Sequence, residues 1–288
     1  MTTIGIAHPG EMGGAVAAAL SGEDARVVWA SAGRSVDTRA RAEDGGLRDV
    51  ETLEELAAQS DLLLAICPPH AAVELAEELA GYRGVYVDAN AIAPQTAMEV
   101  AAIVTAGGAE YVDGSIIGPP PSAAATTRLY LSGERAAELA TLLSAPLIEA
   151  IALDGPTTAA SAIKMVHAGW TKGSAALLLT MRAAALELGV EEPLLAEWER
   201  SQPDLAAKAD RAAQQAAAKA WRWTAEMEEV ALTLESAGLP DGFHRAAAEI
   251  FTRTPPGIDA SGAELLASLL AALPQPAGER KAQRGGLV

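Results

Sequence analysis

The sequence predicts an α/β fold followed by an all-helical region, and three observations support this prediction. Short apolar runs alternate with alanine- and glutamate-rich helical stretches over residues 1–155. The strand-like pattern stops at Asp154-Gly155-Pro156, and only helical patterns follow. Half of the 288 residues are hydrophobic, which is enough for a sizeable core, although aromatic residues make up only 4 %. One or two domains fit this length.

The elements of the first half follow from these runs. Strands are expected at Ile4–Ala7, Val27–Ala30, Leu62–Ile66, Val85–Asp88, Tyr111–Val112, Leu129–Leu131 and Ile148–Leu153. Helices are expected at Gly14–Leu20, Leu53–Gln59, Ala71–Leu79, Gln95–Ala106 and Glu134–Leu143. Strands that alternate with helices across short connections predict a mostly parallel sheet covered on both faces, a doubly wound arrangement.

The second half is expected to contain helices. One long helix spans Thr157–Leu188 and closes on Gly189, a glycine suited to a helix C-terminus. Further helices are expected at Pro193–Ser201, Pro203–Glu235, Gly242–Thr252 and Ser261–Leu273, and the tail after Pro274 is expected to be loose. We therefore expect one domain over residues 1–155 and a helical domain over residues 156–288.

Charge and cysteine content exclude several classes of partner. The chain has 21 basic and 38 acidic residues, a net charge of −17, which argues against nucleic acid and anionic membranes. A single cysteine excludes an internal disulfide and fits a reducing cytoplasm. No leader or apolar run of membrane length is seen, so we expect a soluble, cytoplasmic protein. The four histidines show no metal-ligand spacing, so no metal site is expected.

The most informative stretch is the turn after the first strand, His8-Pro-Gly-Glu-Met-Gly13. A strand, a glycine-bearing turn and a helix present backbone N–H groups to a pyrophosphate. Gly10 would let the backbone approach the phosphates, and Gly13 would let the helix pack closely on the strand. His8 stands where dinucleotide folds usually have glycine, and an ordinary strand–turn–helix is the alternative. The expected cofactor contacts here are His8, Pro9, Gly10, Glu11 and Met12.

The loop after the second strand favours NADP over NAD. It reads Ala-Ser-Ala-Gly-Arg-Ser over residues 30–35 and has no carboxylate before Asp37. Arg34 can bind a 2′-phosphate through two N–H groups, and Ser31 and Ser35 can donate hydrogen bonds. A solvated turn with a chance arginine is the alternative.

Two further loops follow strands and are expected to reach the same edge of the sheet. Cys67-Pro68-Pro69 and Asn90 each lie after a strand, where open α/β sheets bind ligands. Asn90 would contact ribose or nicotinamide, or would instead cap the helix that begins near Pro94. Cys67 fits a small buried residue better than a reactive thiol.

The long helix carries the candidate acid–base group. Lys164 lies in an apolar turn and shares one helix face with His167 and Thr171 by its spacing. A partly desolvated lysine has a lowered pKa and can exchange a proton beside a carbon that accepts hydride. A lysine that reaches the surface is the alternative. A stiff loop, Asp113-Gly-Ser115-Ile-Ile-Gly118-Pro-Pro-Pro121, is a second candidate for substrate contact through Ser115 and backbone amides.

These motifs together resemble the β-hydroxyacid dehydrogenase superfamily, which includes 3-hydroxyisobutyrate and 6-phosphogluconate dehydrogenases; imine reductases share its architecture. The glycine loop, Val87-Asp-Ala-Asn-Ala-Ile-Ala-Pro94, Asp113–Gly118, Lys164 and Glu226-Met-Glu228 follow that family's order. The second half is similar to a poorly characterised bacterial subgroup through Lys164–Lys172, Lys219-Ala-Trp-Arg-Trp223 and Gly238-Leu-Pro-Asp-Gly-Phe-His244.

The resemblance implies a Rossmann-type NAD(P) domain, an all-α C-terminal domain and a homodimer formed through the helices. It implies Lys164 as general acid/base. Substrate contacts are then expected from Ser115, Ile117, Gly118, His167, Trp170, Thr171 and Glu228. The pattern departs from the family at His8, at Ile117-Gly118-Pro119 in place of serine–glycine–glycine, and at His167 and Ala168 where asparagine is usual.

The sequence thus predicts an NADP-dependent dehydrogenase or reductase that acts on a small hydroxy acid or carbonyl compound. Lys164 favours a carbon–oxygen substrate, because imine reductases generally have another residue at that position. The alternatives are reduction of a C=N bond, a non-catalytic NADP-binding protein and, more weakly, a structural dimerisation module. The departures from the family pattern leave the substrate unassigned.

Overall fold

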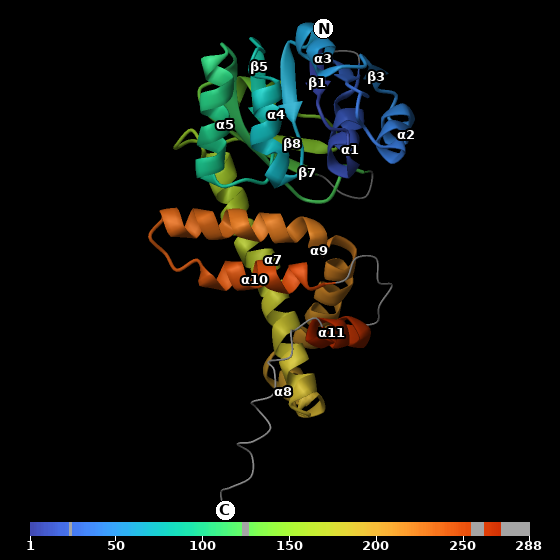
Figure 1. Cartoon of the computed structure of the whole chain (residues 1–288), viewed down its shortest axis with the longest axis vertical. Helices are drawn as coiled ribbons and strands as arrows, with labels where there is room; N and C mark the ends of the chain where they lie inside the picture. The colour runs from blue at the N-terminus through green and yellow to red at the C-terminus, as the bar shows by residue number, and fades with distance from the viewer. Residues whose placement is uncertain (23–24, 123–126, 255–261, 272–288) are drawn as a thin grey trace, which may run out of the picture. The chain divides into compact units, whose positions relative to one another are not determined.

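A computed structural model of the protein describes residues 1–22, 25–122, 127–254 and 262–271 (Figure 1). Its sheet has eight strands in the order β3-β2-β1-β4-β5-β6-β7-β8. Every neighbouring pair is parallel except β6 and β7. The strands are β1 (Thr2–Ile6), β2 (Ala25–Trp29), β3 (Arg48–Asp49), β4 (Leu62–Ala65), β5 (Val85–Asp88), β6 (Glu110–Ile117), β7 (Thr127–Ser132) and β8 (Ile148–Ala152).

Helices connect the strands and then follow them. The first set is α1 (Glu11–Leu20), α2 (Val36–Asp44), α3 (Leu53–Gln59), the short 3₁₀ helix η1 (Pro69–Ala71), α4 (Ala72–Glu78), α5 (Pro94–Ala106) and α6 (Ala136–Leu142). The second set is α7 (Ala159–Glu187), α8 (Glu191–Ser201), α9 (Leu205–Ser236), α10 (Gly242–Thr252) and α11 (Gly262–Ala271). This arrangement confirms the predicted α/β fold with a helical C-terminal region.

Alternating side chains along β4 explain why the sheet is covered on both faces. Leu62 and Leu64 belong to one buried cluster, which also holds Val16 of α1 and Leu139 of α6. Leu63 points to the opposite face, because successive strand residues alternate. Its cluster includes side chains of α3, α4 and α5, namely Leu56, Leu75 and Val100. The two apolar layers make a central strand that is buried on both faces.

Two elements between β2 and α3 were not expected from the sequence. Strand β3 has only two residues, both exposed, so it has no apolar run to reveal it. Helix α2 is polar around most of its surface and buries only Ala42. Its start is fixed instead by Ser35, whose side chain accepts a hydrogen bond from the amide of Thr38 at 3.3 Å.

The predicted glycine cap of α7 is present. Gly189 has a φ of +70°, a conformation that favours glycine. The amide of Val190 donates to the carbonyl of Ala185 at 2.9 Å, as in a glycine-terminated helix end. The predicted last helix, Ser261–Leu273, includes the described helix α11, but both of its predicted ends lie outside the described residues. The tail after Pro274 also lies outside them.

The chain forms two compact units. One contains the described residues of Met1–Trp170 and Ala225–Gly242, and the other contains Thr171–Thr224 together with the described residues from Phe243 onward. The described strands all end by Ala152, and the described elements from Ala159 onward are helices. The two units do not correspond to the two expected domains, because the first part of α7 and the end of α9 belong to the sheet-bearing unit. The expected domain boundary at residue 155 therefore remains a prediction.

The second unit is held together in part by one buried arginine. Arg182 of α7 forms ion pairs with Glu191 of α8 at 2.6 Å and with Asp210 of α9 at 2.5 Å. Arg182 is only 9 % exposed, so these pairs lie where water screens them little. One guanidinium therefore fixes three helices of this unit.

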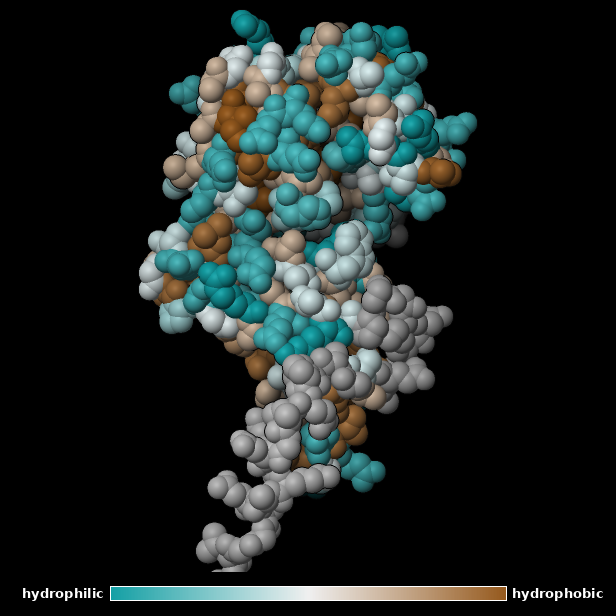
Figure 2. All heavy atoms as spheres, in the orientation of Figure 1, coloured by the Kyte–Doolittle hydropathy of each residue, from teal (hydrophilic) through white to brown (hydrophobic). Residues whose placement is uncertain are grey.

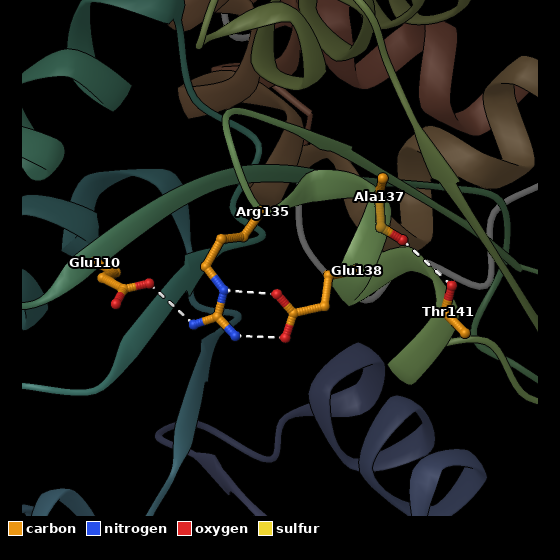
Figure 3. Close-up of polar contacts among 5 residues, drawn as sticks. All are labelled: Glu110, Arg135, Ala137, Glu138 and Thr141. Carbon is orange, nitrogen blue, oxygen red and sulfur yellow. Dashed lines mark hydrogen bonds and ion pairs between the residues drawn. The ribbon is translucent and has the colours of Figure 1, made fainter.

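The surface of the sheet-bearing unit carries many charged groups. Figure 2 shows mainly hydrophilic side chains on one face of this unit, with hydrophobic side chains in scattered patches. Arg135, just before α6, bridges Glu138 through two N–H groups and Glu110 through a third (Figure 3). These hydrogen bonds raise the pKa of Arg135. No described helix is both long and apolar enough to cross a membrane.

Candidate active site

The loops after β1, β4 and β5 lie at one edge of the sheet. These strands are adjacent and parallel, so their carboxyl ends meet where open α/β sheets bind ligands. The loops contain the predicted residues His8–Gly10, Cys67–Pro69 and Asn90. The amide of Cys67 donates to Oδ1 of Asn90 at 2.6 Å, which ties two of the loops directly.

The glycine loop leaves open space at one position and is tightly packed at the other. A Cβ on Gly10 would meet no heavy atom within 4 Å. A Cβ on Gly13 would lie 2.4 Å from the carbonyl oxygen of His8. The sequence-based reason for Gly13 was therefore incomplete, because its closest constraint is the backbone of the turn and not the strand.

The start of α1 fits an anionic ligand. Gly10 is the N-cap residue, and a glycine has no side chain with which to cap this helix end. The turn is closed by the amide of Gly10, which donates to the carbonyl of His8 at 2.8 Å. Helix N-termini present N–H groups and a partial positive charge, which suit a pyrophosphate. The open position beside Gly10 gives such a group room to approach.

The β2–α2 loop brings Arg34 onto the glycine loop. A terminal nitrogen of Arg34 lies 2.7 Å from Nδ1 of His8. Arginine can only donate hydrogen bonds, so Nδ1 accepts and the proton of the neutral imidazole resides on Nε2. Burial, and secondly the charge of Arg34, lowers the pKa of His8 to about 4. The imidazole is thus uncharged at neutral pH.

Other residues of this loop hold its shape. Ser31 is buried, and its amide donates to Asp49 at 3.2 Å. The hydroxyl of Ser35 is used as the helix cap of α2. Arg39 donates to the carbonyl of Ser31 at 2.8 Å and was not anticipated from the sequence. Its position one turn into α2, four residues after the serine cap, is the signal that was available.

Arg34 retains binding capacity for an anion. Its Nε is buried and has no acceptor among the residues that the structure describes. A buried guanidinium N–H of this kind is costly unless a ligand supplies the acceptor. Burial is also the largest effect on Arg34 and lowers its pKa, since the charged form is disfavoured. The loop therefore fits a phosphorylated nucleotide.

The side chain of Asn90 joins the loops after β4 and β5 by hydrogen bonds. Besides accepting from Cys67, its Nδ2 donates to Oδ1 of Asp88 at 2.7 Å. The N-cap of α5 is Ala93, followed by Pro94 at the first helical position, so the capping alternative for Asn90 is wrong. Burial raises the pKa of Cys67 to about 12, which makes its thiol a poor nucleophile. Pro68 and Pro69 stiffen the start of η1.

Lys164 of α7 is enclosed by an acceptor and an acid. Its Nζ donates to the carbonyl of Ile116 at 2.8 Å and lies 3.6 Å from a carboxylate oxygen of Glu226. The two side chains are 15 % and 10 % exposed. The ammonium group of Lys164 therefore lies, partly buried, between a carbonyl acceptor and a carboxylate.

In the motif Glu226-Met-Glu228, Glu226 is the residue that faces Lys164, and Glu229 just after the motif was not expected from the sequence. Contact of Glu228 with substrate stays a prediction. Glu228 is exposed, whereas Glu226 is 7 % exposed and faces Lys164. Glu229 accepts from the amide of Ala93 at 2.7 Å and from the hydroxyl of Thr96 at 2.8 Å. Positions three apart share a helix face, so helical spacing along α9 was the available signal.

Residues expected to hold the substrate near Asp113 are committed to anchoring α7. The hydroxyl of Ser115 is fully buried and donates to the carbonyl of Ala160 at 2.6 Å. Asp113 accepts from the amide and hydroxyl of Ser161, at 2.8 and 2.6 Å, and from Ser132 at 2.9 Å. Burial raises the pKa of Asp113 to about 6. This network fixes the helix turn that carries Lys164.

The remaining predicted substrate residues lie in different environments. Ile117 ends β6 and is buried, and Gly118 follows with a φ of +127°. His167, Trp170 and Thr171 are exposed, in contrast to Lys164 on the same helix. Their contact with substrate stays a prediction.

The fold, with loops gathered at the carboxyl ends of adjacent parallel strands, is of the kind that binds dinucleotides. The chain belongs to the family described as the NAD binding domain of 6-phosphogluconate dehydrogenase, whose model matches residues 2–160. Residues 185–254 match a domain of unknown function, DUF1932. Together these matches place the chain in the β-hydroxyacid dehydrogenase-like superfamily.

Individual relatives agree with this assignment. An uncharacterized 28.5 kDa protein of Methanothermus fervidus is 30 % identical over 166 residues, which cover 57 % of this chain and 63 % of that protein. A conserved hypothetical protein from Sinorhizobium meliloti is 26 % identical, with a TM-score of 0.70, over 95 % of this chain and 97 % of that one.

Two further solved structures show the same fold. MTH1747, described as structurally similar to 3-hydroxyacid dehydrogenases, is 27 % identical, with a TM-score of 0.65, over 94 % of this chain and 99 % of that one. A reductive aminase from Aspergillus terreus in complex with NADPH and ethyl levulinate is 21 % identical, with a TM-score of 0.54, over 94 % and 99 %. The latter likeness shows the fold alone.

Proposed function

We propose that the protein is an NADP(H)-dependent oxidoreductase in which Lys164 exchanges the proton beside a reacting carbonyl or alcohol carbon. The observation that carries this proposal is the enclosure of Lys164 by the Ile116 carbonyl and Glu226. A lysine in the β-hydroxyacid dehydrogenase-like superfamily, held as a partly buried ammonium, would supply the acid that carbonyl reduction requires. The preference for NADP rests on Arg34 and on a loop without a carboxylate over residues 30–35.

In this proposal the cofactor transfers the hydride, Lys164 transfers the proton, and neighbouring side chains hold Lys164 in place. When bound, the nicotinamide cofactor supplies or accepts the hydride at the substrate carbon. Lys164 donates its proton to the substrate oxygen during reduction and recovers one from the hydroxyl during oxidation. Glu226 favours the ammonium form and fixes the direction in which Nζ can donate. Asp113 and Ser115 hold the helix turn from which Lys164 projects.

A turnover assay tests this function directly. Purified protein is mixed with NADPH and a panel of small β-oxo acids, aldehydes and cyclic imines, and nicotinamide absorbance is followed. Lys164→Met should lower turnover of the best carbonyl by about a thousandfold, within the range for loss of a general acid, while NADPH affinity stays within about twofold. Lys208→Met, at an exposed position of α9, is the matched control and should retain activity. Turnover that survives in Lys164→Met would contradict the proposal.

Reduction of a C=N bond is a second candidate, because the fold is shared with a reductive aminase. The same panel separates the two reactions. Turnover of imines without turnover of any carbonyl would replace the carbonyl assignment. Binding of NADPH with no turnover of any compound would favour the non-catalytic alternative.

We also propose that a second copy of the chain covers one face of α7. Val166, Trp170, Leu177 and Met181 are exposed apolar residues spaced by four, seven and four positions, so they share one helix face. Exposed apolar stripes of this kind are typical of contact surfaces. Light scattering should give the mass of a dimer, and Leu177→Glu with Met181→Glu should shift it to the monomer. A monomeric wild-type protein at about 10 μM, a concentration at which even a micromolar interface is mostly occupied, would contradict this.

A further inference from the structure

The contact between His8 and Arg34 joins two loops that the sequence separates widely. His8 follows β1 and Arg34 follows β2, and these strands are adjacent and parallel. The 2.7 Å contact therefore spans the edge of the sheet between the glycine loop and the β2–α2 loop. His8 is the residue at which the glycine loop departs from the usual dinucleotide pattern, so the departure coincides with a new interaction.

The chemistry of this pair is directional. The guanidinium donates, and the imidazole accepts at Nδ1, so the pair needs a neutral histidine. His8 is mostly enclosed and its pKa is lowered, which keeps it neutral. A neutral acceptor orients the guanidinium while leaving its positive charge uncompensated by that partner. A carboxylate in the same place would orient it and also neutralise it.

The surroundings of Arg34 restrict how its guanidinium can lie, and the charge of Glu78 also acts on it. Arg39 donates to the carbonyls of Ser31 and Arg34, at 2.8 and 3.4 Å, and braces the main chain of the loop. With the main chain braced and one terminal nitrogen on His8, the guanidinium plane is fixed. Its buried Nε still has no acceptor among the described residues.

We propose that His8 is a positioning residue that holds the Arg34 guanidinium for the 2′-phosphate of an adenine nucleotide. This inference rests on the proposed use of NADP, and it assigns a role to the histidine where glycine is usual. Arg34 is the group that contacts the phosphate, and His8 acts through it. The discrimination between phosphorylated and unphosphorylated ribose should therefore depend on the acceptor at position 8.

Two ligand fragments isolate this role from catalysis. Adenosine 2′,5′-bisphosphate carries the 2′-phosphate, and adenosine 5′-monophosphate lacks it. Their affinities are measured by calorimetry for wild-type protein, His8→Leu, His8→Asn and Arg34→Ala. Leucine and asparagine have nearly the same shape, but only asparagine offers an acceptor.

The expected pattern is specific to the acceptor. His8→Leu should weaken bisphosphate binding by about tenfold, equivalent to about 1.4 kcal/mol, and leave monophosphate binding within about twofold. His8→Asn should restore most of the bisphosphate affinity. Nitrogen NMR of the imidazole should show an unprotonated Nδ1 at neutral pH in wild-type protein, and this signature should be lost in Arg34→Ala.

The outcomes separate this inference from the function on which it rests. Preference for the bisphosphate that disappears in Arg34→Ala but survives in His8→Leu would overturn the role of His8 alone. Equal weakening of both fragments by His8→Leu would likewise reduce His8 to a structural part of the loop. Wild-type protein that binds both fragments equally would overturn the NADP assignment and this inference together.

Discussion

Arg34 and Lys164 are two partly buried cations of the sheet-bearing unit that differ in the partners they meet. Arg34 donates to a neutral imidazole, and its Nε is left without an acceptor in the described part of the chain. Lys164 donates to a carbonyl and lies beside a carboxylate. Arg34 thus has a neutral hydrogen-bond partner, although the charge of Glu78 also acts on it, whereas Lys164 has a carboxylate beside its ammonium group.

This difference shows how the partner decides what a cation can do. A cationic side chain binds phosphate more weakly when a neighbouring carboxylate compensates its charge. A lysine that acts as a general acid must hold its proton, so it needs neighbours that favour the ammonium form despite partial burial. The two sites therefore predict opposite responses when their partners are exchanged.

The largest effect should come from giving Arg34 an acidic partner. His8→Asp should weaken NADPH binding by about a hundredfold, equivalent to about 2.7 kcal/mol, because the new carboxylate neutralises and repels. Binding of NADH should weaken by at least about threefold less than that of NADPH, because both nucleotides carry the pyrophosphate but only NADPH carries the 2′-phosphate. Quenching of protein fluorescence measures both constants, and His8→Asn is the control. Equal losses of affinity for the two nucleotides would show that the new carboxylate does not act through Arg34 and the 2′-phosphate.

The reverse exchange, at Lys164, should have a smaller effect. Glu226→Gln replaces the acid with a neutral group of the same size, so the pKa of Lys164 should fall. Turnover at pH 8 should drop by about tenfold, in the lower part of the range for acid–base groups. The basic limb of the pH–rate profile should move to lower pH. An unchanged profile would show that Glu226 does not govern the lysine; Glu235→Gln, exposed on α9, controls for loss of charge.

The fold was largely predictable because its apolar runs are unambiguous. Strand β5 and helices α3 and α10 have the predicted bounds, and the other predicted strands and the helices of the first half differ at their ends by a few residues. The placing of the loops after β1, β4 and β5 at one edge of the sheet was also predictable, because it follows from the order of parallel strands. The cofactor contacts of these loops stay a prediction.

The side-chain partners could not be read from the sequence. His8 and Arg34, or Lys164 and Glu226, meet only through the tertiary fold, across 26 residues in the first case. The hydroxyl of Ser115 likewise has a partner that spacing does not reveal, the carbonyl of Ala160. Its contact with substrate stays a prediction. Spacing gives the face of an element, but not which neighbour lies opposite.

A third charged group, Asp88, has an amide as its hydrogen-bond partner and should respond to pH. Burial raises its pKa to about 7, above its ordinary value, so the folded state takes up a proton that the unfolded state lacks. Its contribution to stability should fall as pH rises, by about 1 kcal/mol between pH 6 and pH 8. Urea unfolding at both pH values measures this.

Asp88→Asn removes the titrating group while retaining the acceptor for Asn90. The fall in stability between pH 6 and pH 8 should shrink by the contribution of Asp88. A variant with the same dependence as the wild type would assign the titration to another group, such as Asp113.

The smallest effect is expected at the surface. Arg135 joins Glu138 and Glu110 where water screens the charges (Figure 3). Arg135→Ala should lower the thermal midpoint by less than about 3 °C. Calorimetry measures the shift, and a decrease as large as that caused by Arg182→Ala would contradict the distinction between screened and buried charges.

Whether Arg34 binds the 2′-phosphate of the cofactor is tested most directly by the affinities for NADPH and NADH of wild-type protein and of Arg34→Ala. Wild-type protein should bind NADPH at least about tenfold more tightly than NADH, and Arg34→Ala should remove that preference. Equal affinity for the two nucleotides in wild-type protein, or a preference that survives the loss of Arg34, would show that Arg34 does not bind the 2′-phosphate.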